Sequence, residues 1–363
     1  MSNQKVGLVS YGISAPYYRL AVDEIIELWM NSSLDTIKVS QGVLERGVLS
    51  QDEDGNTLAV AAVKESFKRM GDTGKVQALY YGTCTNPYDS RPSSTMILEA
   101  LGLPYRTKCC DLQFSMKSGT AALIHAAAMV QAGLAQQAVA IGADTVNRHT
   151  APGDLVEPYA SAAAGALVVG TQDLAATIDG MESYSSDLSD GFRVEGERYL
   201  RTGMLLGSAK NEVGLDAHTK VAVEALLQKL DAKLSDFHYV VFQQNTPGTA
   251  RHCAKLLGAA DSQYKPAIYA DRLGDTGSAA PFVGLAKVLD QAKAGERILL
   301  CAYGYGAGAD AIALTVTPEL EKIRAGARSV DQWLERKEMV DYKKAMKLEY
   351  KYLRHSYPLN AYL

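Results

Sequence analysis

The chain has 363 residues, a formal net charge of −4, and 37 Lys and Arg against 41 Asp and Glu. Its 47% hydrophobic and 21% charged residues exclude a disordered or fibrous chain. The balanced charge and the lack of an apolar run of ~18 residues lead us to expect neither nucleic acid nor a membrane as partner. Five cysteines without Cys-x-x-Cys spacing, and no secretory signal at the start, predict free thiols in the cytoplasm.

Strands and helices alternate along the first half of the chain. Short apolar runs predict strands, and apolar residues at helical spacing predict helices. The expected strands are 6–10, 76–81, 108–112, 137–142 and 166–170, and the expected helices are 21–30, 58–70, 93–101 and 118–133. The last helix carries no charged side chain, which predicts that it is enclosed on all sides.

The second half repeats the same order of elements. Helices are expected at 220–230, 250–257 and 278–292, and strands at 239–243, 297–302 and 311–316. The glycine-rich turn YGYGAGAD lies between two strands, so it does not fit a dinucleotide-binding loop, which a helix must follow. The alternation predicts a layered α/β protein. We expect one half at 1–175, a second at 176–317, and a charged, Tyr-rich amphipathic arm at 318–363 that packs over the core or docks a partner.

The segment DLQFSMKSGTAAL, residues 111–123, predicts a strand that turns abruptly into the uncharged helix. A side chain at this turn lies at the positive end of the helix dipole, where a cysteine would have a lowered pKa. The residue there is Met116, whose thioether has no proton to lose and forms no stable acyl ester. Neighbouring Ser115 has a hydroxyl but no evident base. The six histidines show no metal-ligand spacing, so we predict no metal and no cofactor.

Several motifs together resemble the thiolase-like condensing enzymes, in the branch of hydroxymethylglutaryl-CoA synthase and ketoacyl-ACP synthase III. They are GTCTNPYDSRPSS, FSMKSGTAAL, AIGADT, APGDLVEPYASAAAGALVVG, VVFQQN, GDTGSAA and AYGYGAGADAIALTV. The resemblance covers residues 5 to about 316. It implies a duplicated thiolase fold, layered α-β-α-β-α around a buried central helix.

The same resemblance implies four functional positions, each of which holds another residue type here. The family's nucleophilic cysteine falls at Met116 and its acid/base glutamate at Cys84. Its histidine falls at Gln243, an amide without a useful pKa, and an asparagine falls at Asp275. We therefore expect these four positions to be degenerate and the chain to lack its own nucleophile.

The sequence, including its tail, most resembles the condensing-enzyme-like subunit of the bacterial acetyltransferase that makes the antibiotic 2,4-diacetylphloroglucinol. This implies a non-catalytic structural subunit of a multi-component C-acyltransferase. Its partners would be a thiolase-like catalytic subunit and a small OB-fold, zinc-ribbon-type subunit, in a self-dimer or hetero-oligomer. Two alternatives stay open. One is an autonomous condensing enzyme of the hydroxymethylglutaryl-CoA synthase type using a displaced thiol, Cys84 or Cys110. The other is a protein that binds an acyl-CoA or a phenol.

Overall fold

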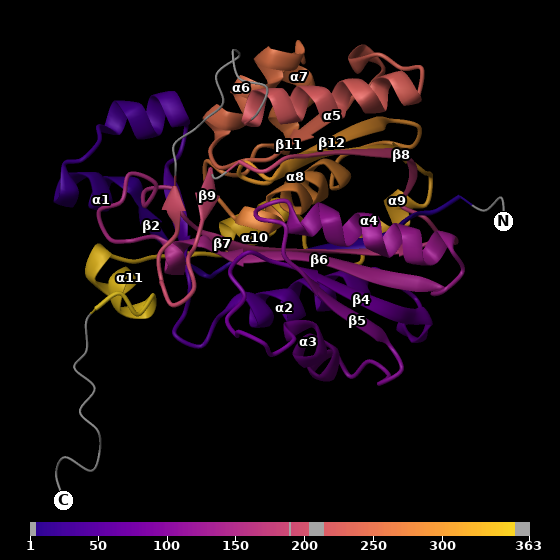
Figure 1. Ribbon diagram of the computed structural model, residues 1–363, viewed down its shortest axis with the longest axis horizontal. Helices are drawn as coiled ribbons and strands as arrows, with labels where there is room; N and C mark the ends of the chain where they lie inside the picture. Colours follow the sequence, from indigo (N-terminus) through magenta and orange to yellow (C-terminus); the bar gives the residue numbers. More distant parts are fainter. Residues whose placement is uncertain (1–4, 189, 203–213, 353–363) are drawn as a thin grey trace, which may run out of the picture.

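The computed structural model describes residues 5–188, 190–202 and 214–352. Within these ranges nine strands form one hydrogen-bonded sheet, in the order β11-β12-β13-β8-β1-β7-β6-β4-β5. The strands are β1 Gly7–Ser14, β4 Val76–Gly82, β5 Lys108–Leu112, β6 Gln137–Thr145, β7 Ala162–Gly170, β8 Ala176–Ser185, β11 Tyr239–Phe242, β12 Arg297–Tyr303 and β13 Gly308–Val316. Strands β1 and β8 pair over two residues each, and there the sheet folds into two layers (Figure 1).

Helices cover both layers outside and fill the space between them (Figure 1). Helices α2 and α3 cover the layer of β1, β7, β6, β4 and β5, and α5, α6 and α7 cover the other layer. Helices α4 and α8 lie between the layers, which confirms the predicted α-β-α-β-α arrangement. The bounds are α2 Gly55–Lys68, α3 Ser93–Leu101, α4 Ser118–Gln131, α5 Leu215–Lys229, α6 Pro247–Leu257, α7 Asp261–Tyr264 and α8 Ala280–Leu289.

The prediction that the helix at 118–133 is enclosed on all sides is wrong for its C-terminal half. His125, Ala128 and Gln131 of α4 are exposed, whereas its first turns are buried. Small alanines are tolerated in solvent, so a lack of charge did not require burial. The more completely enclosed helix is α8, nine of whose ten residues are buried.

The central helices approach the sheet so closely that glycine is required at the crossing. A Cβ atom added at Gly119 of α4 or at Gly142 of β6 would lie 2.3 Å from the carbonyl oxygen of Ser278. Ser278 belongs to the 3-10 turn η6 that leads into α8. Three backbone segments therefore meet here without room for a side chain.

Smaller elements flank the layers. A three-stranded sheet, in the order β14-β2-β3, lies beside α1, and the hairpin β9–β10 follows β8. Its parts and the remaining helices are β2 Tyr18–Ala21, α1 Val22–Trp29, η1 Asp35–Gln41, β3 Glu45–Val48, η2 Thr73–Lys75, η3 Val146–His149, β9 Gly191–Phe192, β10 Arg201–Thr202, η4 Leu234–Asp236, η5 Lys265–Ala267, η6 Gly277–Ala279, α9 Leu320–Arg324, α10 Val330–Glu335, β14 Glu338–Met339 and α11 Tyr342–Leu348.

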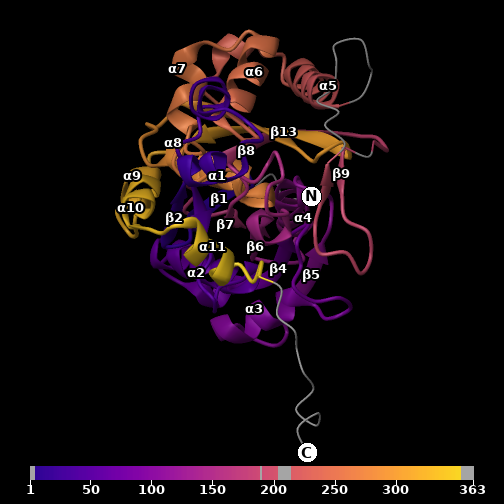
Figure 2. The same cartoon turned by 90° about the vertical axis from the view of Figure 1, so that its left-hand side faces the viewer.

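The expected C-terminal arm packs on the core in its described part. Val330, Trp333 and Leu334 of α10 join the main hydrophobic cluster, and β14 pairs with β2. Figure 2 shows α9, α10 and α11 along the outside of the layers. Residues 353–363, which include Tyr357 and Tyr362 of the predicted Tyr-rich tail, lie outside the described residues, and the domain boundaries stay a prediction.

Candidate active site

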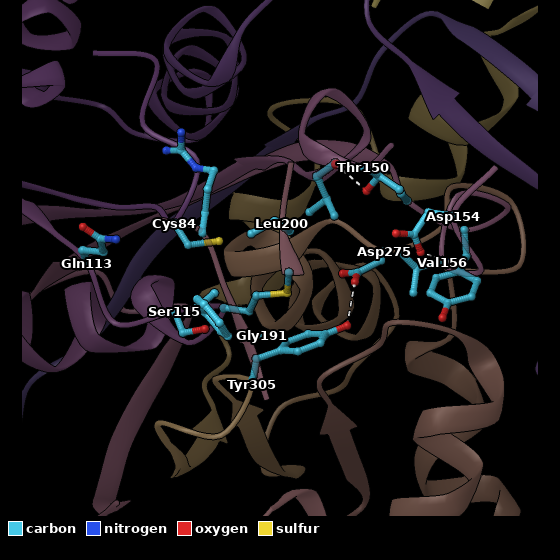
Figure 3. Close-up of a pocket in the computed structure, with 16 residues that line it drawn as sticks. Cys84, Gln113, Ser115, Thr150, Asp154, Val156, Gly191, Leu200, Asp275 and Tyr305 are labelled. Atoms are coloured by element: carbon cyan, nitrogen blue, oxygen red, sulfur yellow. Dashed lines mark hydrogen bonds between the residues drawn. The ribbon is translucent and has the colours of Figure 1, made fainter. Parts of the chain in front are cut away.

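A cavity of about 250 Å³ opens beside the turn that leads into α4 (Figure 3). Its walls come from that turn, from the segment 146–160, from the hairpin 191–200 and from the loops that hold Cys84, Asp275 and Tyr305. The lining residues are Cys84, Gln113, Ser115, Met116, Val146, Thr150, Asp154, Val156, Tyr159, Ala160, Gly191, Phe192, Arg193, Leu200, Asp275 and Tyr305. Three of the four positions singled out from the sequence, Cys84, Met116 and Asp275, therefore share one cavity.

The turn into α4 has the abrupt geometry that the sequence predicts. Ser115 adopts a left-handed conformation with φ 48°, and α4 begins at Ser118. The hydroxyl of Ser118 donates to the carbonyl oxygen of Ser115 at 2.6 Å. The buried ammonium of Lys117 donates to Asp310 Oδ1 at 2.9 Å, which ties the turn to β13. These contacts fix the backbone on both sides of Met116.

Met116 occupies the turn as an apolar wall residue. Its side chain is 5% exposed and packs in a cluster with Val146 and Ala160, with Cys84 and Tyr305 against it. A thioether has no ionisable proton, so the helix dipole has no thiolate to stabilise here. Met116 therefore supplies no nucleophile at this turn.

Cys84 is a thiol held in a hydrogen-bonded place rather than an activated nucleophile. Its Sγ donates to Asp144 Oδ2 at 3.3 Å. Burial, and then the neighbouring Asp144 carboxylate, raise the pKa of the thiol well above its usual range. The thiolate, which is the reactive form, is therefore scarce near neutral pH.

Asp144 is an acceptor whose oxygens are already occupied. Its Oδ1 accepts from the hydroxyls of Thr83 and Thr85 at 2.8 and 2.7 Å, and from the amides of Cys84 and Thr85 at 2.9 and 3.0 Å. Its Oδ2 accepts from the amide of Ser278 at 2.7 Å. These donors fill the hydrogen-bonding positions of the carboxylate and fix it in place beside Cys84.

Asp275 is the carboxylate in the cavity whose acid–base properties suit catalysis near neutral pH. Burial raises its pKa to about 6, with a further contribution from the Asp144 charge. Its Oδ1 accepts from the amide of Gly277 at 2.9 Å, and its Oδ2 accepts from Asn245 Nδ2 at 2.7 Å. A general base is most effective when its pKa lies near the working pH.

Tyr305 faces Asp275 across the cavity (Figure 3). Its hydroxyl donates to Asp275 Oδ2 at 3.4 Å and accepts from Asn245 Nδ2. Burial, together with the Asp275 charge, raises the pKa of this phenol well above its usual range, so it stays a proton donor. Sequence reasoning missed Asn245 and Tyr305. The signals were present in VVFQQN and in the glycine-rich turn, where Tyr305 has φ 40°.

Gln243 and Cys110 lie away from the cavity lining. Gln243 is buried, and its Nε2 donates to the carbonyl of Gly277 at 2.9 Å, so it supports the loop after Asp275. Cys110 lies on the edge strand β5 and, with Cys109, lines a separate cavity. The expectation that Cys110 approaches the same cavity as Cys84 is not met, because β5 is the edge strand of the sheet and Cys110 is not among the residues that line that cavity.

Neither a metal cluster nor a membrane helix is found where the structure describes the chain. No group of three or more His, Cys, Asp or Glu among the described residues is arranged to hold a metal ion. No described helix combines the length and the apolar character needed to cross a bilayer. The five cysteines are free.

Comparisons with known proteins place the chain in a family. It is 37% identical over 337 residues to a hydroxymethylglutaryl-CoA synthase of Methanocaldococcus jannaschii, which covers 93% of this chain and 96% of that protein. A protein of the same name from Methanopyrus kandleri is 35% identical over 96% of this chain and 98% of its own length. The chain belongs to the hydroxymethylglutaryl-CoA synthase family.

Solved structures and a family model agree with this assignment at the level of the fold. The structure of MvaS in complex with 3-hydroxy-3-methylglutaryl coenzyme A matches with a TM-score of 0.85 and 21% identity, covering 96% of this chain and 92% of that one. The 3-oxoacyl-(acyl carrier protein) synthase III of Pseudomonas aeruginosa PAO1 matches with a TM-score of 0.77 and 21% identity, covering 86% and 98%. The model of the C-terminal part of 3-oxoacyl-ACP synthase III matches residues 227–316. The predicted thiolase-like fold is confirmed.

These relatives correct the functional prediction. The expected non-catalytic structural subunit of a phloroglucinol acyltransferase is contradicted, because relatives over nearly the full length are named as hydroxymethylglutaryl-CoA synthases. The finer resemblance to the subunit that makes 2,4-diacetylphloroglucinol falls with it. The changed residue types at the family's catalytic positions predict a lost activity, whereas the relatives favour the autonomous condensing enzyme.

Proposed function

We propose that this protein is an autonomous condensing enzyme that joins the α-carbon of a coenzyme A thioester to a carbonyl carbon, with Asp275 as the acid–base group. The observation that carries the proposal is a buried carboxylate with a pKa of about 6 lining the cavity beside the α4 turn. Membership of the hydroxymethylglutaryl-CoA synthase family supports the class of reaction. Met116 supports a route without an acyl group on the enzyme, since a thioether carries none.

The chemistry follows from the groups around Asp275. The ionised carboxylate takes a proton from the carbon next to the thioester carbonyl, and the C–H electron pair becomes an enolate. The enolate carbon then attacks the carbonyl of the second substrate, and the resulting alkoxide takes the proton back from Asp275. The positive end of α4, close to the cavity, stabilises the enolate oxygen. Both substrates must be bound together, so the kinetics are sequential.

The displaced-thiol route is the alternative that the experiment must separate. Cys84 lines the cavity, but its raised pKa and the occupied oxygens of Asp144 disfavour attack by the thiolate. All five cysteines are free thiols, as expected of a protein in a reducing compartment, and this supports our placing of the protein in the cytoplasm.

The test uses acetyl-CoA as a probe in deuterated water. We expect the enzyme to exchange the acetyl methyl protons for deuterium, as measured by mass spectrometry, with a rate that rises with pH through about 6. Asp275→Asn should lower this rate at least 100-fold, in line with the usual contribution of a general base. Asp271→Asn is the matched control, because burial raises the pKa of Asp271 too but the residue lies outside the cavity lining. Binding of acetyl-CoA without exchange would favour a binding protein, and an acetyl group on Cys84 would favour the displaced thiol. Either result overturns the proposal.

A further inference from the structure

The residues after α11 form a buried cluster of four charges with the body of the protein. Arg46 of β3 donates through Nη1 to Glu349 Oε1 at 2.6 Å, and Lys351 Nζ lies 3.1 Å from Glu349 Oε2. Glu157 completes the cluster, with Oε1 3.7 Å from Lys351 Nζ and 3.9 Å from Arg46 Nη2. All four side chains are 0% exposed. Two positive and two negative groups therefore neutralise one another away from water.

The four-charge cluster holds one wall of the cavity, the segment 146–160. Glu157 Oε2 accepts from the amide of Gly153 at 2.7 Å, which closes the loop that carries Asp154 and Val156. Glu157 Oε1 accepts from the hydroxyl of Tyr342 on α11 at 3.1 Å. Asn147 Nδ2, at the start of the same wall, donates to Glu349 Oε1 at 2.9 Å.

The arm also holds a second wall of the cavity, the hairpin 191–200. The guanidinium of Arg198 donates to the carbonyl oxygens of Glu349 and Tyr350 at 2.6 and 2.5 Å. The amide of Leu200 donates to the carbonyl of His149 at 2.7 Å, which joins the two walls directly. Glu349 and Lys351 line no part of the cavity, yet Glu349 contacts both walls, and Lys351 lies beside Glu157 of the first.

We propose that Glu349 and Lys351 are positioning residues that hold the two walls of the cavity around a bound acyl thioester. The two walls are a loop segment and a hairpin with few strand hydrogen bonds. Their shape therefore depends on their contacts with the rest of the protein. Loss of one charge leaves a buried partner unpaired, and the arm then separates from both walls together. The role in catalysis rests on the proposed function, but the role in holding the walls does not.

Hydrogen–deuterium exchange of the full-length protein, followed by mass spectrometry, measures the walls without any assay of activity. In Glu349→Gln we expect the peptides covering 150–160 and 191–200 to exchange about tenfold faster or more, and those of β6 and β12 to stay unchanged. Glu338→Gln is the matched control. Glu338 lies on the same arm in an exposed pair with Lys344 at 3.1 Å, and its loss should change wall exchange less than twofold.

Two substitutions of Lys351 and a milder one of Tyr342 distinguish a positioning role from a general loss of stability. Lys351→Arg keeps the charge and should keep the protection, whereas Lys351→Met should lose it. If Glu349→Gln does not fold, Tyr342→Phe removes one hydroxyl and should speed exchange about threefold in 150–160 alone. Unchanged exchange in both walls, or an equal rise in every peptide, would overturn the proposal.

Activity gives a second and separate readout. With acetyl-CoA as substrate of the exchange reaction, Glu349→Gln should raise KM at least fivefold and lower kcat less than threefold, since the walls bind the thioester and Asp275 is untouched. A fall in kcat with unchanged KM would contradict a positioning role. If the unmodified protein exchanges no acetyl protons, the proposed function fails while the exchange of the walls still decides the present inference.

Discussion

Two groups of buried ionisable side chains, the four-charge cluster and the groups beside the cavity, differ in their charge balance. The four-charge cluster pairs Arg46 and Lys351 with two carboxylates. Beside the cavity, Cys84 and Asp275 have Asp144 as their charged neighbour, and within the described residues no ion pair reaches either aspartate. Burial opposes the charge of Glu349, but Arg46 and Lys351 together outweigh it and lower the pKa of Glu349. Burial raises the pKa of Asp275 to about 6.

This difference in charge balance distinguishes a structural role from a catalytic one. A buried carboxylate with a cation beside it stays ionised and fixes the chain, because neutralising it leaves the cation unpaired. A buried carboxylate without a cation exchanges its proton near neutral pH, which is what a general acid or base requires. Burial alone therefore does not identify a catalytic carboxylate. The charge of the groups beside the carboxylate distinguishes a catalytic role from a structural one.

The largest expected effect breaks the balanced cluster. Arg46→Met removes one of two cations and leaves Glu157 and Glu349 with Lys351 alone, so we expect a loss of about 3–5 kcal/mol in the free energy of unfolding. Urea denaturation at pH 7 measures it. Lys344→Met, in the exposed pair with Glu338, is the control and should cost less than about 1 kcal/mol. Equal effects of the two variants would show that the buried cluster is not held by charge.

A smaller effect of opposite sign is expected at Asp275. The pKa of Asp275 is raised from 3.8 to about 6 in the folded state, so the folded state binds the proton more tightly than the unfolded state does. The resulting contribution to the free energy of unfolding is fully present below pH 3.8 and is lost as the pH rises through 6. Asp275→Asn should therefore be more stable than the unmodified protein at pH 8, by about 2–3 kcal/mol at 1.36 kcal/mol per pKa unit. At pH 3 the two should agree. Unfolding curves at both pH values test this, and a variant less stable at pH 8 would contradict it.

The smallest effect is expected at the turn into α4. Met116→Leu keeps the side-chain volume and removes the sulfur, so stability should fall by less than about 1.5 kcal/mol. The rate of acetyl proton exchange should stay within threefold, because no acyl group passes through this position. A tenfold loss of exchange in a protein that keeps its stability would assign the sulfur a part in the reaction.

The fold was predictable from the sequence because the hydrophobic periodicity and the family motifs extend over most of the chain. Alternating strands and helices indicated the layers, and the motifs around Gly82, Met116 and Gly274 indicated the family. The error at α4 has a physical cause, since alanine is compatible with both core and surface. The sharp fold between β1 and β8 rests on two residues of each strand, and no sequence pattern marks so short a pairing.

The site was predictable in its positions but not in its chemistry. Cys84, Met116 and Asp275 lie where the motifs place them, around one cavity. The substitution of family residue types led to the expectation of an inactive subunit, because sequence alone does not show that Asp275 is buried beside Asn245 and Tyr305. Such contacts join positions 30 and 60 residues apart, and a pKa depends on them rather than on residue type.

The crossing of Gly119, Gly142 and Ser278 limits where this protein can be redesigned. Even an alanine at either glycine would clash with the main-chain oxygen of Ser278, so this crossing of α4, β6 and η6 tolerates no new side chain. The segment 146–160 and the hairpin 191–200 carry their side chains on loops instead. Attempts to change the shape of the cavity should therefore begin at those two walls and leave the glycine crossing unaltered.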